Sequence, residues 1–262
     1  MTVQTILDYV NSLAPRQMKC DWDNVGLLCG RRDQAVKKVL VALDPFMDVC
    51  EEAKVIGADL IVTHHPLIFR APKSVTTDDT VGQCILFLAA NGISAVNAHT
   101  NLDCAPDGVN DILARTLGLE QIKVLNPMGT DAEGRPWGLL RAGTVAEMPL
   151  EAFLHRVKSQ LHTPVLRYAD GGKPVRRVAV GGGACGDAYP EALAAGCDTL
   201  VTADVKYNQF WDAHDLGLNL IDAGHFYTEN PVCAVLAEKL QAQFPEIEVV
   251  LSHNHADCMK FF

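Results

Sequence analysis

Imidazole and carboxylate side chains gather after three short segments of this sequence that are predicted to be strands, at 60–63, 93–96 and 218–221. The residues that follow the three segments are, in chain order, His64 and His65; His99, Asn101 and Asp103; and Asp222, His225 and Glu229. Histidine nitrogens and carboxylate oxygens are ligands of divalent transition metals. The carboxyl ends of strands in an open α/β sheet are where ligands bind. The set as a whole therefore predicts a metal site.

The spacing within the set favours more than one ion. Adjacent side chains of a strand point to opposite faces, but His64 and His65 stand where the chain turns into Pro66. There they can splay, so that two ions held close together would use one histidine each. His225 and Glu229 are four residues apart and share a face if the chain is helical there.

The other histidines fit ordinary surface positions. His155 and His162 lie on or just after an amphipathic helix expected at 150–161, and His214 follows Trp211 on a second surface helix. We expect none of these three to bind metal.

Two further motifs each allow two interpretations. His253, His255 and Asp257 alternate after a strand expected at 247–251, so in an extended chain they would face one way and form a peripheral metal site; a solvated tail is the favoured interpretation. The glycines at 181–183 could expose backbone amides to a phosphate. A tight turn, or close packing against another lobe, is favoured because the run lacks the lysine of a phosphate loop.

Strand and helix patterns alternate along the chain, which predicts an α/β protein with mostly parallel sheets. Strands are expected at 39–43, 60–63 and 93–96, and helices at 45–57, 80–90 and 109–117. Asp44 is predicted to cap the first of these helices and Gly57 to end it.

The same pattern then recurs. Residues 37–63 and 176–202 align without gaps at an offset of 139 and share G-x-D-x-x-V-T. We interpret this as an internal duplication that gives two similar α/β lobes, with the metal site in the cleft between them. The first lobe is expected at 1–125, with 231–262 returning to it, and the second at 126–230. The boundary is placed in the Pro- and Gly-containing segment 121–136.

Composition excludes several classes of protein. The formal net charge is −10 and no Lys/Arg cluster exceeds two residues, so general nucleic-acid binding is not expected. No apolar run approaches the length that spans a bilayer. Nine scattered cysteines without a C-x-x-C pair, together with an N-terminus unlike a signal peptide, predict a cytoplasmic protein.

Six motifs, taken in order, resemble the Nif-three-like dinuclear-metal-centre proteins, a family often named GTP cyclohydrolase I type 2. They are W-D-N-V-G-L (22–27), T-H-H-P-L-I-F (63–69), H-T-N-L-D (99–103), G-V-N-D-x-L-A (108–114), T-A-D-V-K-Y (202–207) and D-A-G-H-x-x-x-E (222–229). The resemblance implies paired α/β lobes, a two-metal site in the cleft and a ring-shaped homohexamer. It implies a set of metal ligands, namely His64, His65, Asp103, His225 and Glu229. The chain departs from the family at Ala203 and Asn208, where glycine and histidine are common.

Five ligands for two ions leave coordination positions open, which is typical of a catalytic site. The expected function is hydrolysis of a small-molecule substrate, a nucleotide or related heterocycle, by a metal-bridged hydroxide. Ring opening of the GTP cyclohydrolase type follows from the family name alone. His99 is expected as a proton shuttle, Lys206 as a charge partner and Tyr207 as a donor to the substrate. Mixed ligands suit zinc, iron or manganese alike. Two alternatives stay open, a metal-trafficking or storage protein and an interaction scaffold stabilised by metal.

Overall fold

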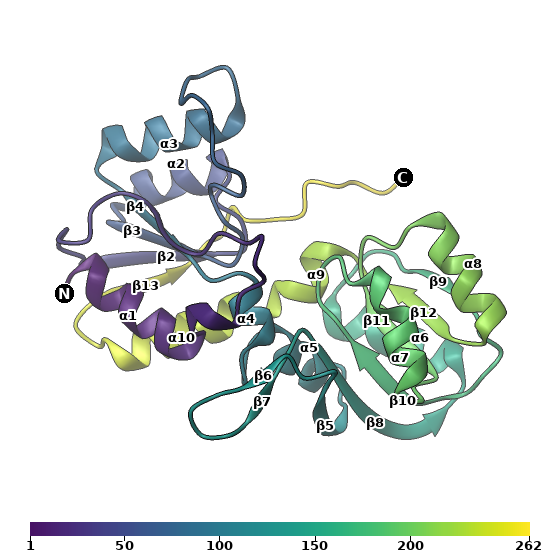
Figure 1. The fold of residues 1–262 in the computed structure, drawn as a ribbon. Coiled ribbons are helices and arrows are strands. Elements are labelled where there is room, and N and C mark those ends of the chain that lie inside the picture. The colour runs from purple at the N-terminus through teal and green to yellow at the C-terminus, as the bar shows by residue number, and fades with distance from the viewer. The chain divides into compact units, whose positions relative to one another are not determined.

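The computed structural model describes residues 1–262 and divides into two compact units. The first unit comprises Met1–Leu102 and Val232–Cys258, and the second comprises Asp103–Pro231 and Met259–Phe262. The division at Leu102 comes earlier than the expected boundary near residue 125, because the helix and strand after Asp103 pack into the second unit. Figure 1 shows the ribbon and the element labels used below.

The first unit is built on a five-stranded sheet in the order β1-β4-β3-β2-β13, parallel except for β1. Its strands are β1 (Gly26–Cys29), β2 (Lys38–Ala42), β3 (Leu60–Thr63), β4 (Ser94–Asn97) and β13 (Glu248–Leu251). Its helices are α1 (Val3–Leu13), the short 3-10 turn η1 (Arg16–Met18), α2 (Met47–Ile56), α3 (Thr80–Asn91) and α10 (Pro231–Gln243), and α4 (Thr100–Cys104) crosses the division. Helices cover both faces of this sheet (Figure 1).

The second unit is built on a six-stranded sheet in the order β5-β8-β10-β11-β12-β9. Its strands are β5 (Glu120–Leu125), β8 (Leu140–Met148), β9 (Arg167–Ala169), β10 (Val175–Val180), β11 (Thr199–Thr202) and β12 (Asn219–Asp222), with a small hairpin of β6 (Gly129–Thr130) and β7 (Pro136–Trp137). Its helices are α5 (Val109–Thr116), α6 (Leu150–Leu161), the 3-10 turn η2 (Gly186–Ala188), α7 (Tyr189–Ala194), α8 (Tyr207–Leu216) and α9 (His225–Glu229). Only β10, β11 and β12 are parallel to one another, so this sheet is mixed.

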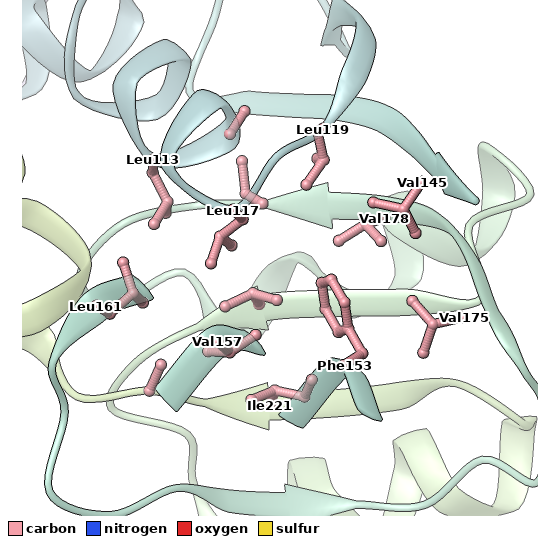
Figure 2. Packing of buried hydrophobic residues seen from close by; sticks show 14 residues of the cluster. Leu113, Leu117, Leu119, Val145, Phe153, Val157, Leu161, Val175, Val178 and Ile221 are labelled. Carbon is pink, nitrogen blue, oxygen red and sulfur yellow. The ribbon is translucent and has the colours of Figure 1, made fainter. Parts of the chain in front are cut away.

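Alternation along the central strands of the second unit builds a core on each face. Val178 and Val180 pack with Phe153 of α6 and Leu113 of α5 (Figure 2). Ala179 lies on the opposite face, in the cluster that α7 and α8 cover. Strands buried on both faces are nearly continuous apolar runs, which is why they are recognisable in the sequence.

The two units repeat the same strand–helix–strand arrangement, as the constant offset predicts. Val39 pairs with Leu60 in the first sheet and Val178 with Thr199 in the second, each 139 residues later. The conserved spacing extends to hydrogen bonds: Asp59 accepts from the amides of residues 37 and 38, and Asp198 accepts from those of 176 and 177. The G-x-D motif is therefore a structural device of each unit.

One expectation about the ends of α2 needs correction and the other is confirmed. Helix α2 is preceded by Phe46 at its N-cap, not by Asp44; the Asp44 side chain bonds a histidine instead. At the other end Gly57 adopts the left-handed conformation, as predicted for a helix-ending glycine. None of the helices has both the length and the apolar character needed to cross a membrane.

Candidate metal centre

Three histidines of the first unit form a cluster at the carboxyl ends of β3 and β4. The rings of His64 and His65 lie 5.0 Å apart, and His99 lies 5.2 Å from the first ring and 5.5 Å from the second. One nitrogen from each comes within 4.8 Å of the others. His64 is buried, and the other two are partly buried. This is a donor set that fits a metal ion.

Each ring in this cluster has its Nδ1 nitrogen fixed by an oxygen acceptor. His64 Nδ1 lies 2.9 Å from the Ala98 carbonyl oxygen, His65 Nδ1 lies 2.6 Å from Asp44 Oδ1, and His99 Nδ1 lies 2.8 Å from Asp23 Oδ1. Carbonyl and carboxylate oxygens only accept, so Nδ1 must carry the proton. Nε2 is then the nitrogen that can donate its lone pair to a metal.

The W-D-N motif explains how the cluster is oriented. Asp23 bonds His99 and also accepts from the Thr100 amide, at 3.0 Å, and from the Thr100 hydroxyl. Burial raises the pKa of Asp23, but the bonds from His99 and Thr100 outweigh it and lower this pKa to about 2. The Asn24 side chain donates to the Ile68 carbonyl oxygen at 2.6 Å. The motif thus ties the loop after β4 to the loop after β3.

The second unit presents an imidazole and a carboxylate on α9. His225 Nε2 lies 3.1 Å from Glu229 Oε2, and its Nδ1 lies 2.7 Å from Asp204 Oδ2. The predicted spacing of four residues therefore does place both donors on one face of a helix. Asp204 has a φ of 51°, an uncommon conformation for a residue with a side chain. A strained residue that orients a histidine indicates a functional site.

The glycine run after β10 fits against these two donors. The amides of Gly182 and Gly183 donate to Asn110 Oδ1 at 2.7 Å and to Thr228 Oγ1 at 3.0 Å. Side chains of the same unit thus take the amides that a phosphate would need, so the phosphate interpretation is wrong. A Cβ on Gly183 would lie 2.1 Å from Glu229 Oε1. The run is therefore glycine because it packs against α9 of its own unit.

Asp103, the remaining predicted ligand, is buried at the start of the second unit. Asn110 Nδ2 donates to its carbonyl oxygen at 3.2 Å. The buried Arg141 donates to the next two carbonyl oxygens, of Cys104 and Ala105, at 3.2 and 3.0 Å, and pairs with Asp111 at 2.8 Å. The N-D pair of the G-V-N-D motif therefore fixes the backbone that carries Asp103.

The predicted substrate residues begin α8. Lys206 is the residue before this helix, and its Nζ lies 3.2 Å from Asp187. Tyr207 is the first helical residue and is largely exposed. Both follow Asp204 closely in the chain. Their roles toward a substrate stay predictions.

The three histidines that are not expected to bind metal lie on or at the end of helices in the second unit. His155 lies within α6, His162 ends that helix, and His214 is exposed on α8 beside Asp215.

The alternating C-terminal histidines do not extend the strand β13. The chain curls after Leu251, and buried Glu52 accepts from the Ser252 hydroxyl and from the amides of His253 and Asn254 at 2.9 and 3.2 Å. His255 Nδ1 lies 2.9 Å from the Ser252 carbonyl oxygen. The alternation therefore does not align the three side chains on one face.

Sequence reasoning missed the carboxylates that orient the histidines. Asp23, Asp44 and Asp204 each bond an imidazole Nδ1. Each was visible as an acidic residue next to a strand end or within a quoted motif. What the sequence lacks is the pairing, because 21 to 76 residues separate each aspartate from its histidine.

The class of protein follows from comparison with known proteins. The family model Duf34/NIF3 (NGG1p interacting factor 3) matches residues 1–257. The chain belongs to this family, as the resemblance predicted.

Particular relatives match over their full length. A Clostridium perfringens protein named GTP cyclohydrolase 1 type 2 homolog is 35% identical over 266 residues, covering 100% of both chains. A Clostridium acetobutylicum protein of the same name is 33% identical, covering 100% of this chain and 99% of the relative. Among solved structures, a Bacillus cereus protein related to NIF3 has a TM-score of 0.94 at 26% identity, with 100% and 99% coverage. A Staphylococcus aureus hypothetical protein has a TM-score of 0.93 at 30% identity, with the same coverage.

Proposed function

We propose that the protein is a hydrolase that depends on two divalent metal ions and acts on a nucleotide or related heterocycle. The ligands would be His64 and His65 of the first unit and His225 and Glu229 of the second, with Asp103. Zinc, iron and manganese all suit this donor set. The family membership and the relatives' names support a nucleotide as substrate, without defining the reaction.

One observation carries the proposal: all four histidines named above as candidate donors or shuttle have an acceptor at Nδ1. A histidine ligand usually donates its second ring nitrogen to a carboxylate or carbonyl, which fixes its tautomer and raises its basicity. His214 and His255 also have an acceptor at Nδ1, Asp215 Oδ1 at 3.0 Å and the Ser252 carbonyl oxygen at 2.9 Å. The arrangement supports a metal site because in His64, His65 and His99 it occurs at three rings whose nitrogens lie within 4.8 Å of one another.

When bound, the metal would lower the pKa of a coordinated water and so supply the nucleophile for hydrolysis. The chain's own residues do the rest. Asp23 holds the Nδ1 proton of His99, which leaves His99 Nε2 to take or give a proton at the substrate. Asp44 and Asp204 hold His65 and His225 in place. Lys206 and Tyr207 would contact the polar part of the substrate.

The test is turnover of a nucleotide panel by protein reconstituted with zinc, iron or manganese, with metal content measured in parallel. We expect metal-dependent hydrolysis that is lost in His65→Ala and Glu229→Gln and kept in His214→Ala. His99→Ala should keep its metal and lose about 100-fold or more in kcat. Full metal loading without turnover of any nucleotide would contradict the hydrolase, and rapid transfer of metal to an acceptor protein would support the trafficking alternative instead.

The oligomeric state and the cellular compartment are separate proposals. We propose a homohexamer, which light scattering of the purified protein would measure. We also propose the cytoplasm as its compartment, since nine cysteines that are all free thiols are typical of a reducing environment.

A further inference from the structure

Three large aromatic side chains lie exposed around the histidine cluster of the first unit. Trp22 is 62% exposed, Phe46 63% and Phe69 46%. Aromatic rings normally bury most of their surface, because removal of apolar area from water is favourable. Exposed aromatic rings beside candidate metal-binding side chains indicate a ligand site.

A pocket of about 220 Å³ connects two of these rings to the candidate metal ligands. Its lining includes the exposed Phe46 and Phe69 and the buried Leu67 and Cys84. His65 and its partner Asp44 also line it. A molecule that fills this pocket therefore contacts the His65 side chain.

The third ring extends the aromatic surface from the pocket to His99. The Trp22 and Phe69 rings lie 5.7 Å apart at an interplanar angle of 60°. Both also contact the His99 ring edge-on, each at 6.2 Å. Phe69, which lines the pocket together with Phe46, thus belongs to an aromatic surface that includes Trp22 and reaches His99.

The charges of the pocket restrict its ligand. No lysine or arginine lines it, and its one charged group besides His65 is the Asp44 carboxylate. An anionic group such as a phosphate would be repelled there. An uncharged planar ring is not repelled by this carboxylate and can stack on the Phe46 and Phe69 rings.

We propose that this pocket binds an uncharged heteroaromatic ring of the substrate, stacked on Phe46 and Phe69 with its edge toward His65. The proposal rests on the proposed function for the identity of the ring as part of the substrate. The anionic part of a nucleotide would then lie outside the pocket. Phe46 and Phe69 are specificity-determining residues, since they select a flat ring without taking part in proton transfer.

The experiment measures ring binding to the metal-free full-length protein by calorimetry. The probes are guanosine and cytidine, with ribose 5-phosphate and cyclohexanol as non-aromatic controls. Emission of Trp22 in the Trp137→Phe/Trp211→Phe background provides a second signal, since Trp22 is then the sole tryptophan. We expect both nucleosides to bind and to change this emission. Equal binding of cyclohexanol, or no binding of either nucleoside, would overturn the proposal.

Variants locate the ring. Phe46→Ala and Phe69→Ala should each weaken nucleoside binding by about 5–150-fold, the range that corresponds to one stacking contact. Phe69→Leu keeps an apolar side chain without a ring face and should also bind more weakly. Tyr168→Ala, which removes an aromatic ring of similar exposure in the second unit, should bind as the unchanged protein does. Unchanged affinity in both phenylalanine variants would overturn the proposal.

The outcome is separable from that of the hydrolase. Ring binding that depends on Phe46 and Phe69, without turnover by metal-loaded protein, would support the pocket and contradict the proposed function. Turnover with an unchanged KM in both phenylalanine variants would support the proposed function and contradict the pocket.

Discussion

Replacing Gly183 by alanine should displace Glu229, a proposed metal ligand, without unfolding the protein. An ideal Cβ at this position lies 2.1 Å from Glu229 Oε1 and 3.0 Å from His225 Nε2. Ordinary contacts begin near 3.4 Å, so the Glu229 carboxylate must retreat by roughly 1 Å. A glutamate side chain can do this by rotation. A displacement of this size would take the carboxylate out of reach of a metal ion, because metal–ligand distances vary by only about 0.2 Å.

The two costs can be separated by magnitude. Alanine at the φ of +63° of Gly183 costs about 1–2 kcal/mol in any protein. For a chain of this size that corresponds to a decrease in Tm of a few degrees. Displacement of Glu229 should lower metal affinity by at least ~10-fold, the smaller effect expected even for loss of a supporting contact.

Gly172→Ala provides the matched control. Gly172 has a φ of +71° in the same unit, and a Cβ there meets nothing within 4 Å. Both variants should show a similar decrease in Tm when metal-free. In competition with a chromophoric chelator, only Gly183→Ala should bind metal more weakly. Wild-type metal affinity in Gly183→Ala would refute the assignment of Glu229 as a ligand.

Further substitutions test the supporting residues. Arg141→Met removes the buried cation that pairs with the Asp111 carboxylate and should lower the free energy of unfolding by about 3–5 kcal/mol. Urea denaturation measures this loss, and an unchanged midpoint would contradict the structural role of Arg141. Burial raises the pKa of Glu52, but the bonds from Ser252, His253 and Asn254 lower it overall. The ionised Glu52 therefore stabilises the native state above its unfolded pKa of about 4.3, and this contribution is lost as pH falls through its lower native pKa. Glu52→Gln should lower Tm at neutral pH and make Tm fall less steeply on acidification. The same dependence of Tm on pH in the two proteins would contradict this role of Glu52. Asp204→Ala should weaken metal binding by about 10–100-fold while Asp215→Ala, beside exposed His214, leaves it unchanged; equal affinities would contradict the orienting role of Asp204.

Local patterns predicted the elements of this fold well, because the strands are buried on both faces. The strand expected at 60–63 is β3 itself, and the amphipathic helix expected at 150–161 is α6. The offset of 139 likewise predicted a shared register between β2–β3 and β10–β11. In these cases the information is contained within a few residues of the element.

The unit boundary and the capping of α2 were harder to predict because they depend on long-range contacts. The segment after Asp103 belongs to the second unit through α5 and the carbonyl oxygens that Arg141 binds. Asp44 was predicted as a cap from its place before Pro45, but His65 competes for the carboxylate. Glycine runs pose the same difficulty, since the reason for Gly183 lies on α9, more than forty residues away.

The proposed metal centre requires that histidine Nε2 atoms and carboxylates of both units bind two metal ions. The decisive measurement is anomalous diffraction at the zinc absorption edge from crystals of protein reconstituted with zinc. We expect two anomalous peaks per chain, with Zn–N bonds of about 2.0–2.1 Å to Nε2 of His64, His65 and His225. Peaks bonded to Nδ1, peaks confined to His253 and His255, or no peak at His65 and His225 would contradict it.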